Sequence, residues 1–407
     1  MTTSNGPRLA YLSGPAHGVK FFDEMKGGGS DYFGTNYMKR FIALADDLGV
    51  LSYVVTWHDG EAYDQGRGRF RFHNRPLPKA AGLMYHVRML IWHIGALVSL
   101  WRFRPDVLIV TGNQDFWWTL APLRLLGTRF VASYHSVIWP RCAPATAATR
   151  FYSWLNANLI LRKMVAIVMT SAAIREQVEQ LVGSRSRAPR LIDHLPSYEK
   201  SQFVGISSPL DLPYEVFEII FLGRMEVSKG IYDLLSIAEE LERSRPGEFK
   251  FHFLGDGSEL SSFRNSVSDS NLEKTVIVHG YCKPEAIQAI MSHAHVSVVP
   301  TRSTLTAGFE MTCAEAILSG RPLITSAAAP ALDYLRPASI EVKPDDIDGY
   351  LTAILKLKDN RPLYEELCGE CVGLAAQFYD EENSWTVAMR EALALAFDGS
   401  VRKLEPR

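Results

Sequence analysis

The sequence contains little cysteine, and the cysteines that are present form no recognisable framework. They stand at positions 142, 282, 313, 368 and 371, an odd number without the regular spacing of a disulfide-rich secreted domain. Cys368 and Cys371 form the only C-x-x-C pair, and no second pair completes a zinc site. We therefore expect reduced thiols and no metal bound by cysteine.

The chain also lacks a large excess of either charge and a long apolar run, and we expect no leader sequence. Its 407 residues carry a formal net charge of −2, which argues against a general nucleic-acid binder. The longest apolar run, Met89–Leu100, is interrupted by His93, and its twelve residues are too few to cross a bilayer. The N-terminus has no charged segment followed by a long apolar core, so we expect no signal peptide and a cytoplasmic protein.

Strand-like and helix-like segments alternate along almost the whole chain, which predicts parallel sheets of the doubly wound α/β kind. In the first half, the expected strands are Leu9–Gly14, Leu51–Trp57, Asp106–Gly112, Arg129–His135 and Val165–Ser171. In the second half, they are Phe217–Gly223, Phe249–Gly257, Thr275–Tyr281, His295–Thr301 and Arg321–Ala327. A glycine-rich loop, Gly27–Gly29, follows the first strand and precedes an amphipathic helix over Thr35–Gly49.

The alternation is broken once, at a proline- and serine-containing stretch over Leu195–Tyr214, which we take as the crossing between two domains. We predict an N-terminal Rossmann-like domain over residues 1–203 and a second one over 204–383. The helix at Ser384–Phe397, within residues 384–407, is expected to cross back to the first domain. The two sheets would then face each other across a cleft, with ligands at the carboxyl ends of the strands.

Four loops of the second half follow consecutive strands and carry polar or glycine-rich motifs. Gly223-Arg224 and Lys229-Gly230 come first, then Gly255-Asp256-Gly257, then His279–Ile287, and last Pro300–Pro322 with Glu315 at the start of a helix. Loops at the same edge of a parallel sheet converge in space. Two cations beside a helix N-terminus suit a diphosphate, and a carboxylate next to them suits sugar hydroxyls.

The order and spacing of these motifs resemble the family 4 glycosyltransferases, retaining enzymes of the GT-B fold. The family pattern G-R-x4-K-G, G-D-G and E-G-F-G-x4-E-A-x3-G-x-P corresponds here to GRMEVSKG, GDG and AGFEMTCAEAILSGRP. The resemblance covers about 170 residues of the second half closely and the first half more loosely.

The resemblance implies a role for each matching position. Arg224 and Lys229 would hold the donor diphosphate and act in catalysis with His135, which ends a strand near the reacting centre. Glu315 would bind the ribose hydroxyls. The remaining donor contacts would be Gly28 and Gly29 in the glycine turn, Gly223 and Gly255 at strand ends, Tyr281 and Cys282 at the base, and the backbone of Gly308, Phe309, Glu310, Met311 and Thr312 around the sugar and its phosphate.

One position departs from the family pattern. The first acid of the family's E-x7-E pair is replaced by Ala307, and Glu310 stands where the family usually has glycine. This puts the usual contact to the transferred sugar in doubt and indicates a different donor sugar or a rewired contact, with Glu310 as one candidate. It leaves open a non-catalytic nucleotide-sugar-binding protein, or another GT-B enzyme such as a nucleotide-sugar epimerase or a phosphorylase.

Two further features have plain interpretations. Asp346 and Asp348 precede a helical pattern, so we assign them to a helix N-terminus and not to a metal. Arg67, Arg69 and Arg71 belong to a cation-rich stretch without an acid, which we expect to be a solvated loop, or a patch that meets anionic lipid or a lipid-diphosphate acceptor. Asn113 is a further candidate for that acceptor or membrane contact.

Together these observations predict a retaining hexosyltransferase that uses a UDP- or GDP-sugar and acts in polysaccharide or glycolipid synthesis. The acceptor would be a glycan or a lipid-linked molecule, reached at the inner face of the cytoplasmic membrane. No cofactor or metal ion is expected.

Overall fold

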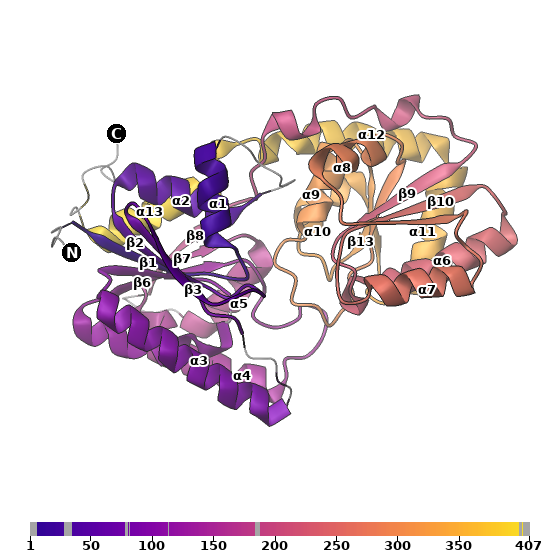
Figure 1. The fold of residues 1–407 in the computed structure, drawn as a ribbon. Coiled ribbons are helices and arrows are strands. Elements are labelled where there is room, and N and C mark those ends of the chain that lie inside the picture. Colours follow the sequence, from indigo (N-terminus) through magenta and orange to yellow (C-terminus); the bar gives the residue numbers. More distant parts are fainter. Residues whose placement is uncertain are drawn as a thin grey trace.

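The computed structural model describes residues 6–27, 35–77, 80, 82–112, 114–183, 188–398 and 401. It has two lobes, each built around one sheet that is covered by helices (Figure 1). The first half of the chain forms one sheet and the second half forms the other. The predicted fold class, two Rossmann-like domains of the GT-B type, is confirmed.

The first sheet has eight strands, all parallel except for the antiparallel β3–β4 pair. Their spatial order is β3 (Tyr63–Arg67), β4 (Phe70–Asn74), β2 (Leu51–Thr56), β1 (Arg8–Leu12), β5 (Val107–Val110), β6 (Arg129–Tyr134), β7 (Ala166–Met169) and β8 (Arg190–Asp193). The expectation of a solvated loop around Arg67–Arg71 is therefore wrong. Phe70 and Phe72 are buried and alternate with the exposed Arg71, a period of two that marks a strand. β8 was not predicted either.

Alternate residues of β1 face opposite layers of helices. Leu9 and Tyr11 belong to one buried cluster, with α2 and the C-terminal helix, while Ala10 and Leu12 belong to another on the opposite face. The helices of this part of the chain are α1 (Gly18–Gly27), α2 (Tyr37–Leu48), α3 (Gly82–Phe103), η1 (Gln114–Leu126), α4 (Ala147–Leu159), η2 (Leu161–Lys163) and α5 (Ala172–Val182). We had expected the glycine-rich loop to follow the first strand directly. Instead, α1 follows β1, and Gly27 is the last residue of this helix.

Helix α3 is longer than the apolar run that we identified in it. It spans 22 residues and is long and apolar enough to cross a membrane by length and composition. The argument that twelve residues are too few for such a crossing is therefore wrong. The run was measured only between charged residues, whereas the helix includes Arg88 and Arg102.

The second sheet has six parallel strands. Their order is β11 (Val276–Gly280), β10 (Phe249–Leu254), β9 (Phe217–Leu222), β12 (Val296–Val299), β13 (Leu323–Ser326) and β14 (Ser339–Val342). The strand order reverses between β9 and β12, and in such sheets ligands bind at the carboxyl ends of the strands on either side of this point. All of these strands were expected except β14.

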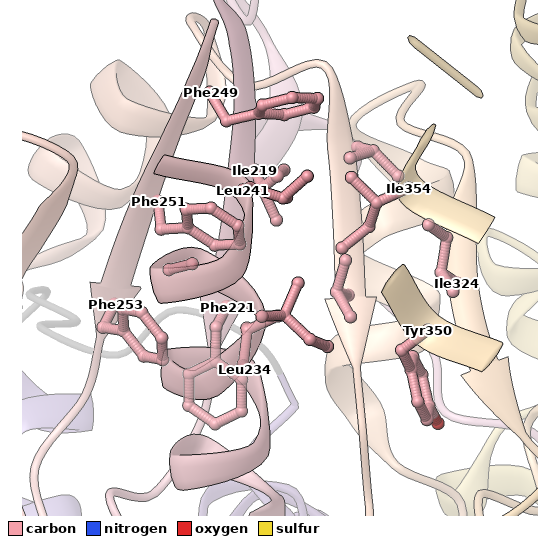
Figure 2. Packing of buried hydrophobic residues seen from close by; sticks show 14 of the residues in the cluster. Ile219, Phe221, Leu234, Leu241, Phe249, Phe251, Phe253, Ile324, Tyr350 and Ile354 are labelled. Atoms are coloured by element: carbon pink, nitrogen blue, oxygen red, sulfur yellow. The ribbon is translucent and has the colours of Figure 1, made fainter. Parts of the chain in front are cut away.

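Helices α6 (Ile231–Ser244), α7 (Leu260–Asp269) and α11 (Ile347–Asp359) cover one face of the second sheet. Figure 2 shows Phe249, Phe251 and Phe253 of β10 packed beside α6, with Ile354 of α11 among the buried side chains. The remaining helices are η3 (Lys200–Phe203), η4 (Pro209–Asp211), η5 (Val227–Lys229), α8 (Pro284–Met291), α9 (Met311–Leu318), α10 (Leu332–Leu335), η6 (Arg336–Ala338), α12 (Arg361–Ala375), η7 (Ala376–Phe378), η8 (Glu381–Asn383) and α13 (Trp385–Phe397). Asp346 caps α11 by accepting a hydrogen bond from the Gly349 amide.

The chain passes between the lobes twice, and the two crossings lie side by side. The Leu195 amide donates to the Asn383 carbonyl, and the Tyr198 amide donates to the Phe378 carbonyl. After the second crossing, α13 packs on the first sheet next to α2 (Figure 1), where Trp385, Met389 and Leu393 are buried. The C-terminal helix is thus part of the core of the N-terminal lobe.

Candidate active site

Loops that follow β9, β10 and β11, together with the first turn of α9, enclose one pocket at the carboxyl edge of the second sheet. The pocket has a volume of about 320 Å³, within the range of small-molecule sites. Its lining residues are Leu222, Gly223, Arg224, Leu254, Gly255, Asp256, Tyr281, Cys282, Ile287, Met311, Thr312 and Glu315. Residues that the sequence placed in separate donor-binding motifs therefore line one cavity.

The two cations predicted to hold a diphosphate have different surroundings. Arg224 lines the pocket, is 65% exposed, and donates to Glu226 Oε1 at 2.7 Å. Lys229 is only 14% exposed, and its Nζ donates to both carboxylate oxygens of Glu310 at 2.7 and 2.8 Å. An exposed pair such as that of Arg224 is separated at small cost. Lys229, in contrast, is held in a largely buried ion pair.

Glu310, which departs from the family pattern, has an unusual backbone conformation. Its φ of 69° lies in the left-handed region that favours glycine, the residue that the family usually has here. Its carbonyl accepts a hydrogen bond from the Cys313 amide at the start of α9, while its carboxylate is bound by Lys229 and makes no capping bond. The ion pair offsets a backbone cost on the order of 1 kcal/mol.

Glu315 lies in the first turns of α9 and brings a carboxyl group into the pocket. Burial raises its pKa to about 7, and the hydrogen bond from the Tyr198 hydroxyl, at 3.4 Å, acts in the opposite direction. A buried carboxyl group with one long hydrogen bond is poorly satisfied. It is therefore well suited to accept hydrogen bonds from ligand hydroxyls.

A glycine at the end of β10 is required by close packing between neighbouring loops. A side chain on Gly255, which has a φ of 140°, would place its Cβ 1.8 Å from the Gly223 carbonyl oxygen. Gly223 and Gly255 therefore bring two backbone segments together at the pocket wall and leave the pocket itself open.

Gly308 brings the first lobe against the loop that precedes α9. A Cβ at this position would lie 1.9 Å from the His135 carbonyl oxygen, and the Gly308 carbonyl accepts a hydrogen bond from Ser171 Oγ at 2.8 Å. His135 follows β6 and Ser171 precedes α5, so the contact is with the carboxyl edge of the first sheet. The two lobes meet at the residues predicted to surround the transferred sugar.

The ring of His135 is held by a chain of hydrogen bonds in the first lobe. Trp385 Nε1 donates to Ser133 Oγ at 2.8 Å, and Ser133 Oγ lies 3.0 Å from His135 Nε2. The serine hydroxyl can then donate to Nε2, which leaves the ring proton on Nδ1. Nδ1 is buried and has no hydrogen-bond partner among the described residues. Burial, with a smaller contribution from His194, lowers the pKa of His135 to about 3, so the ring is neutral.

Neither chain neighbour of Gly308 belongs to the lining of the pocket. Ala307 is buried, and Phe309 is only 2% exposed and packs on Tyr334 and Phe378. Any donor contact of Phe309 must therefore come from its backbone, as the sequence predicted. No carboxylate stands at position 307, so Glu310 is the acid of this loop that lies next to Lys229.

Other predicted site residues lie elsewhere or outside the described part of the chain. Arg67 pairs with Asp23 of α1 at 3.1 Å, and Arg71 pairs with Asp64 of the neighbouring strand β3 at 2.6 Å, so both arginines already have an acidic partner. Arg69 follows β3 in the same hairpin. Gly28, Gly29 and Asn113 lie outside the described residues.

Sequence reasoning missed the residues that support the site from a distance. Tyr198, in the crossing segment, reaches Glu315, while Ser133 and Trp385 orient His135. These partners are 117 and 252 residues apart along the chain, and no local pattern marks them. Within the described ranges, no group of three or more His, Cys, Asp or Glu side chains is arranged to hold a metal ion.

Each of the two lobes matches a known protein family. Residues 216–360 match the family described as glycosyl transferases group 1, and residues 34–191 match the glycosyl transferase 4-like domain. The chain is 23% identical, over 207 residues, to 2-deoxystreptamine N-acetyl-D-glucosaminyltransferase of Niallia circulans, which is 50% of this chain and 52% of that protein. The matches span about half to three fifths of the length of the curated relatives.

Solved structures share the arrangement of both lobes. Sucrose-phosphate synthase from Thermosynechococcus elongatus aligns with a TM-score of 0.66 at 15% identity over 98% of each chain. Anabaena Alr3699/HepE in complex with UDP aligns with a TM-score of 0.64 at 13% identity, over 97% of this chain and 100% of that one. At these identities the likeness shows the fold.

Proposed function

The chain belongs to the group 1 glycosyltransferases of the GT-B fold, and on this premise we propose that it transfers a hexose from a nucleoside diphosphate sugar to a glycan or lipid-linked acceptor, with retention of configuration. One observation carries the proposal. A single pocket holds the buried carboxyl group of Glu315 and the guanidinium of Arg224, with the Lys229–Glu310 pair next to the start of α9. The carboxyl group of Glu315 suits a ribose, and the cations Arg224 and Lys229 suit a diphosphate.

The donor binds with its ribose hydroxyls on Glu315 and its diphosphate on Arg224, Lys229 and the amides at the start of α9. Negative charge grows on the diphosphate as the bond to the sugar breaks, and fixed positive groups at that place lower the barrier. Because these groups supply the positive charge, the proposal requires no metal ion or cofactor. UDP is the first nucleotide to test, since a protein of the same fold was solved with UDP bound.

Glu310 changes partner when the donor binds. Its carboxylate accepts hydrogen bonds from the Lys229 ammonium in this structure. The donor phosphate carries a higher charge and displaces the carboxylate from Lys229. The released carboxylate then accepts hydrogen bonds from hydroxyls of the transferred sugar, a task for which position 307 offers no acid. The exchange lets one lysine neutralise Glu310 at rest and the diphosphate during reaction.

The transfer step takes place between the lobes. The bond from the sugar's anomeric carbon to the diphosphate oxygen breaks, and the acceptor oxygen bonds to that carbon on the same face. The acceptor proton passes to the departing phosphate oxygen. His135 is neutral, and its Nδ1–H, which is buried in this structure, donates a hydrogen bond to a hydroxyl of the sugar once movement of the lobes or of neighbouring side chains exposes the ring.

A two-stage experiment tests the function. First, thermal unfolding is measured with UDP, GDP, ADP and their common sugars, because a ligand raises stability according to its concentration over Kd. The donor found in this way is then incubated with candidate acceptors, and nucleotide release and the anomeric configuration of the product are followed. Binding without acceptor-dependent release contradicts a transferase and favours a nucleotide-sugar-binding protein, the alternative that Ala307 leaves open.

A further inference from the structure

Helix α3 carries an exposed row of apolar side chains along its outer face, which we call the apolar stripe. Leu83 is 81% exposed and Ile91 is 64% exposed. The stripe consists of Leu83, Met84, Val87, Ile91, Ile94 and Val98. Folded monomers rarely leave so many large apolar side chains together in water, and such patches mark interaction sites.

The stripe is continuous because of the helix period. At about 100° per residue, its members fall within roughly 100° of the helix circumference. From Leu83 to Val98 the stripe extends for roughly 22 Å along the axis at about 1.5 Å per residue. Met89, Ala96 and Leu100 lie on the opposite side and are fully buried in the first lobe. The helix is therefore apolar on both sides, although only one side packs on the protein.

Helix α4 extends the same surface. Phe151 is 55% exposed and Trp154 is 61% exposed, and they are three residues apart on one side of the helix. The two helices lie side by side at the edge of the first lobe (Figure 1), where the Tyr152 hydroxyl is 2.9 Å from His86 Nδ1. Trp101, near the end of α3, is 38% exposed. Exposed tryptophans at the borders of an apolar surface are typical of a membrane interface.

The charges on these two helices are of one sign. Neither α3 nor α4 contains an Asp or a Glu. Arg88 and Arg102 of α3 and Arg150 of α4 are exposed, and the two arginines of α3 fall along one border of the stripe by the helix period. An apolar face bordered by cations and aromatic rings, with no acid on either helix, is complementary to an anionic lipid surface.

We propose that the apolar stripe and the outer side of α4 dock this protein on an anionic lipid bilayer, with α3 lying in the plane of the interface. The helix does not cross the bilayer, because its inner side forms part of the core and Trp92 Nε1 donates to the Arg75 carbonyl at 2.8 Å. This contact surface replaces the Arg67–Arg71 segment, in which Arg67 and Arg71 are paired with aspartates.

The docking also orients the cleft. The N-terminal end of α3 follows β4, whose carboxyl end lies at the same edge of the first sheet as that of β6, before His135. A bilayer under α3 therefore lies near the acceptor side of the cleft. Resting on the proposed function, this favours a lipid-linked acceptor over a soluble glycan.

Vesicle co-sedimentation tests the proposal without donor or acceptor, so that its outcome is independent of the transferase activity. The full chain is mixed with phosphatidylcholine vesicles with and without phosphatidylglycerol. We expect binding to the anionic vesicles, and a loss of about tenfold or more in the Ile91→Glu/Ile94→Glu variant. Both side chains are exposed, so the variant should fold, and an unchanged unfolding temperature checks this. Val372→Glu, at a position 77% exposed on α12, is the matched control and should bind like the wild type.

Four results overturn the proposal. The wild type fails to sediment with anionic vesicles, or the double variant binds as well as the wild type. Alternatively, light scattering finds that the wild type is a dimer and that the double variant is a monomer, which makes the stripe a contact with a second copy of the chain. An Arg67→Ala/Arg69→Ala/Arg71→Ala variant that loses as much binding as the stripe variant moves the contact to that hairpin and likewise refutes the assignment.

Discussion

The ion pair between Lys229 and Glu310 leads to a prediction in which stability and catalysis respond differently. The perturbation is Lys229→Met, which keeps the approximate length of the side chain and removes its charge. In the wild type, Nζ lies 2.7 and 2.8 Å from the two Glu310 oxygens, and the side chains are 14% and 7% exposed. The substitution leaves a largely buried carboxylate without its cation and the diphosphate without one of its two fixed charges.

The two losses have different expected sizes. Breaking a buried pair by removing one partner costs about 3–5 kcal/mol, and the position of Glu310 at a helix N-terminus reduces this to about 2–3 kcal/mol. Losing one preorganised charge in the transition state costs about 2–4 kcal/mol, or a fall in kcat/KM of roughly 30- to 1000-fold. Lys229→Met should therefore be both less stable and much less active.

The double variant Lys229→Met/Glu310→Gln separates the two effects. A neutral glutamine side chain at position 310 needs no cation, so the free energy of unfolding should return to within about 1 kcal/mol of the wild type. The activity should stay low, because the diphosphate still lacks its lysine. Urea unfolding measures the first quantity, and nucleotide release with the identified donor and acceptor measures the second.

Arg224→Met is the matched comparison for this series. Its pair with Glu226 is exposed, so we expect a stability change of less than about 1 kcal/mol together with a clear loss of activity. The reasoning is refuted if Lys229→Met keeps kcat/KM within about twofold of the wild type. It is refuted equally if the double variant regains wild-type activity, since Lys229 would then serve only to neutralise Glu310.

Three further outcomes follow from buried groups of the site and of the C-terminal helix. Burial raises the pKa of Glu315 from 4.5 to about 7, so the folded state holds a proton that the unfolded chain releases. The stability that this group contributes therefore falls as pH rises from about 4.5 to about 7. Donor affinity should rise about tenfold from pH 6 to 8, because the carboxylate ionises in that range. Both pH trends should vanish in Glu315→Gln, which unfolding experiments test for stability and calorimetric titration tests for donor affinity. If the trends persist in this variant, another group causes them. Gly308→Ala, whose Cβ would meet the His135 carbonyl oxygen at 1.9 Å, should lower kcat with little change in nucleotide affinity. Gly373→Ala, on an open helix surface, is the control and should leave kcat unchanged. If the two variants have equal kcat values, the close approach of the lobes is contradicted. Met389→Ala, in the core of the first lobe, should cost about 2–5 kcal/mol in urea unfolding, and a smaller loss than about 1 kcal/mol contradicts the docking of α13.

Local pattern was sufficient for most of the fold. Segments such as Phe217–Gly223 are apolar, short and bounded by glycine, and each of the ten predicted strands overlaps a strand of the structure. β3 and β4 were missed because their exposed cations suggested a solvated loop, while the alternation of Phe70 and Phe72 was not used. β8 and β14 are edge strands with partly exposed residues, for which the apolar signal is weak.

The convergence of these residues on one pocket, the proposed donor site, was predictable for the same reason. Gly223, Gly255 and Tyr281 follow successive strands, and a parallel sheet brings the ends of its strands to one edge. The partners of the site residues were not predictable. Lys229 and Glu310 are 81 residues apart, and Tyr198 and Glu315 are 117 apart, so their contacts depend on how the loops and the crossing segment pack.

The sequence alone determined the doubly wound lobes and the positions of Arg224, Lys229 and Glu315, because strand periodicity and motif spacing are local properties. Only the tertiary structure decided which charges remain available. It paired Lys229 with Glu310 and Arg67 with Asp23, buried Glu315 until its pKa rose to about 7, and left one side of α3 uncovered. Burial and ion pairing depend on neighbours that are distant in the chain, and for that reason they are set by the packing of the folded protein.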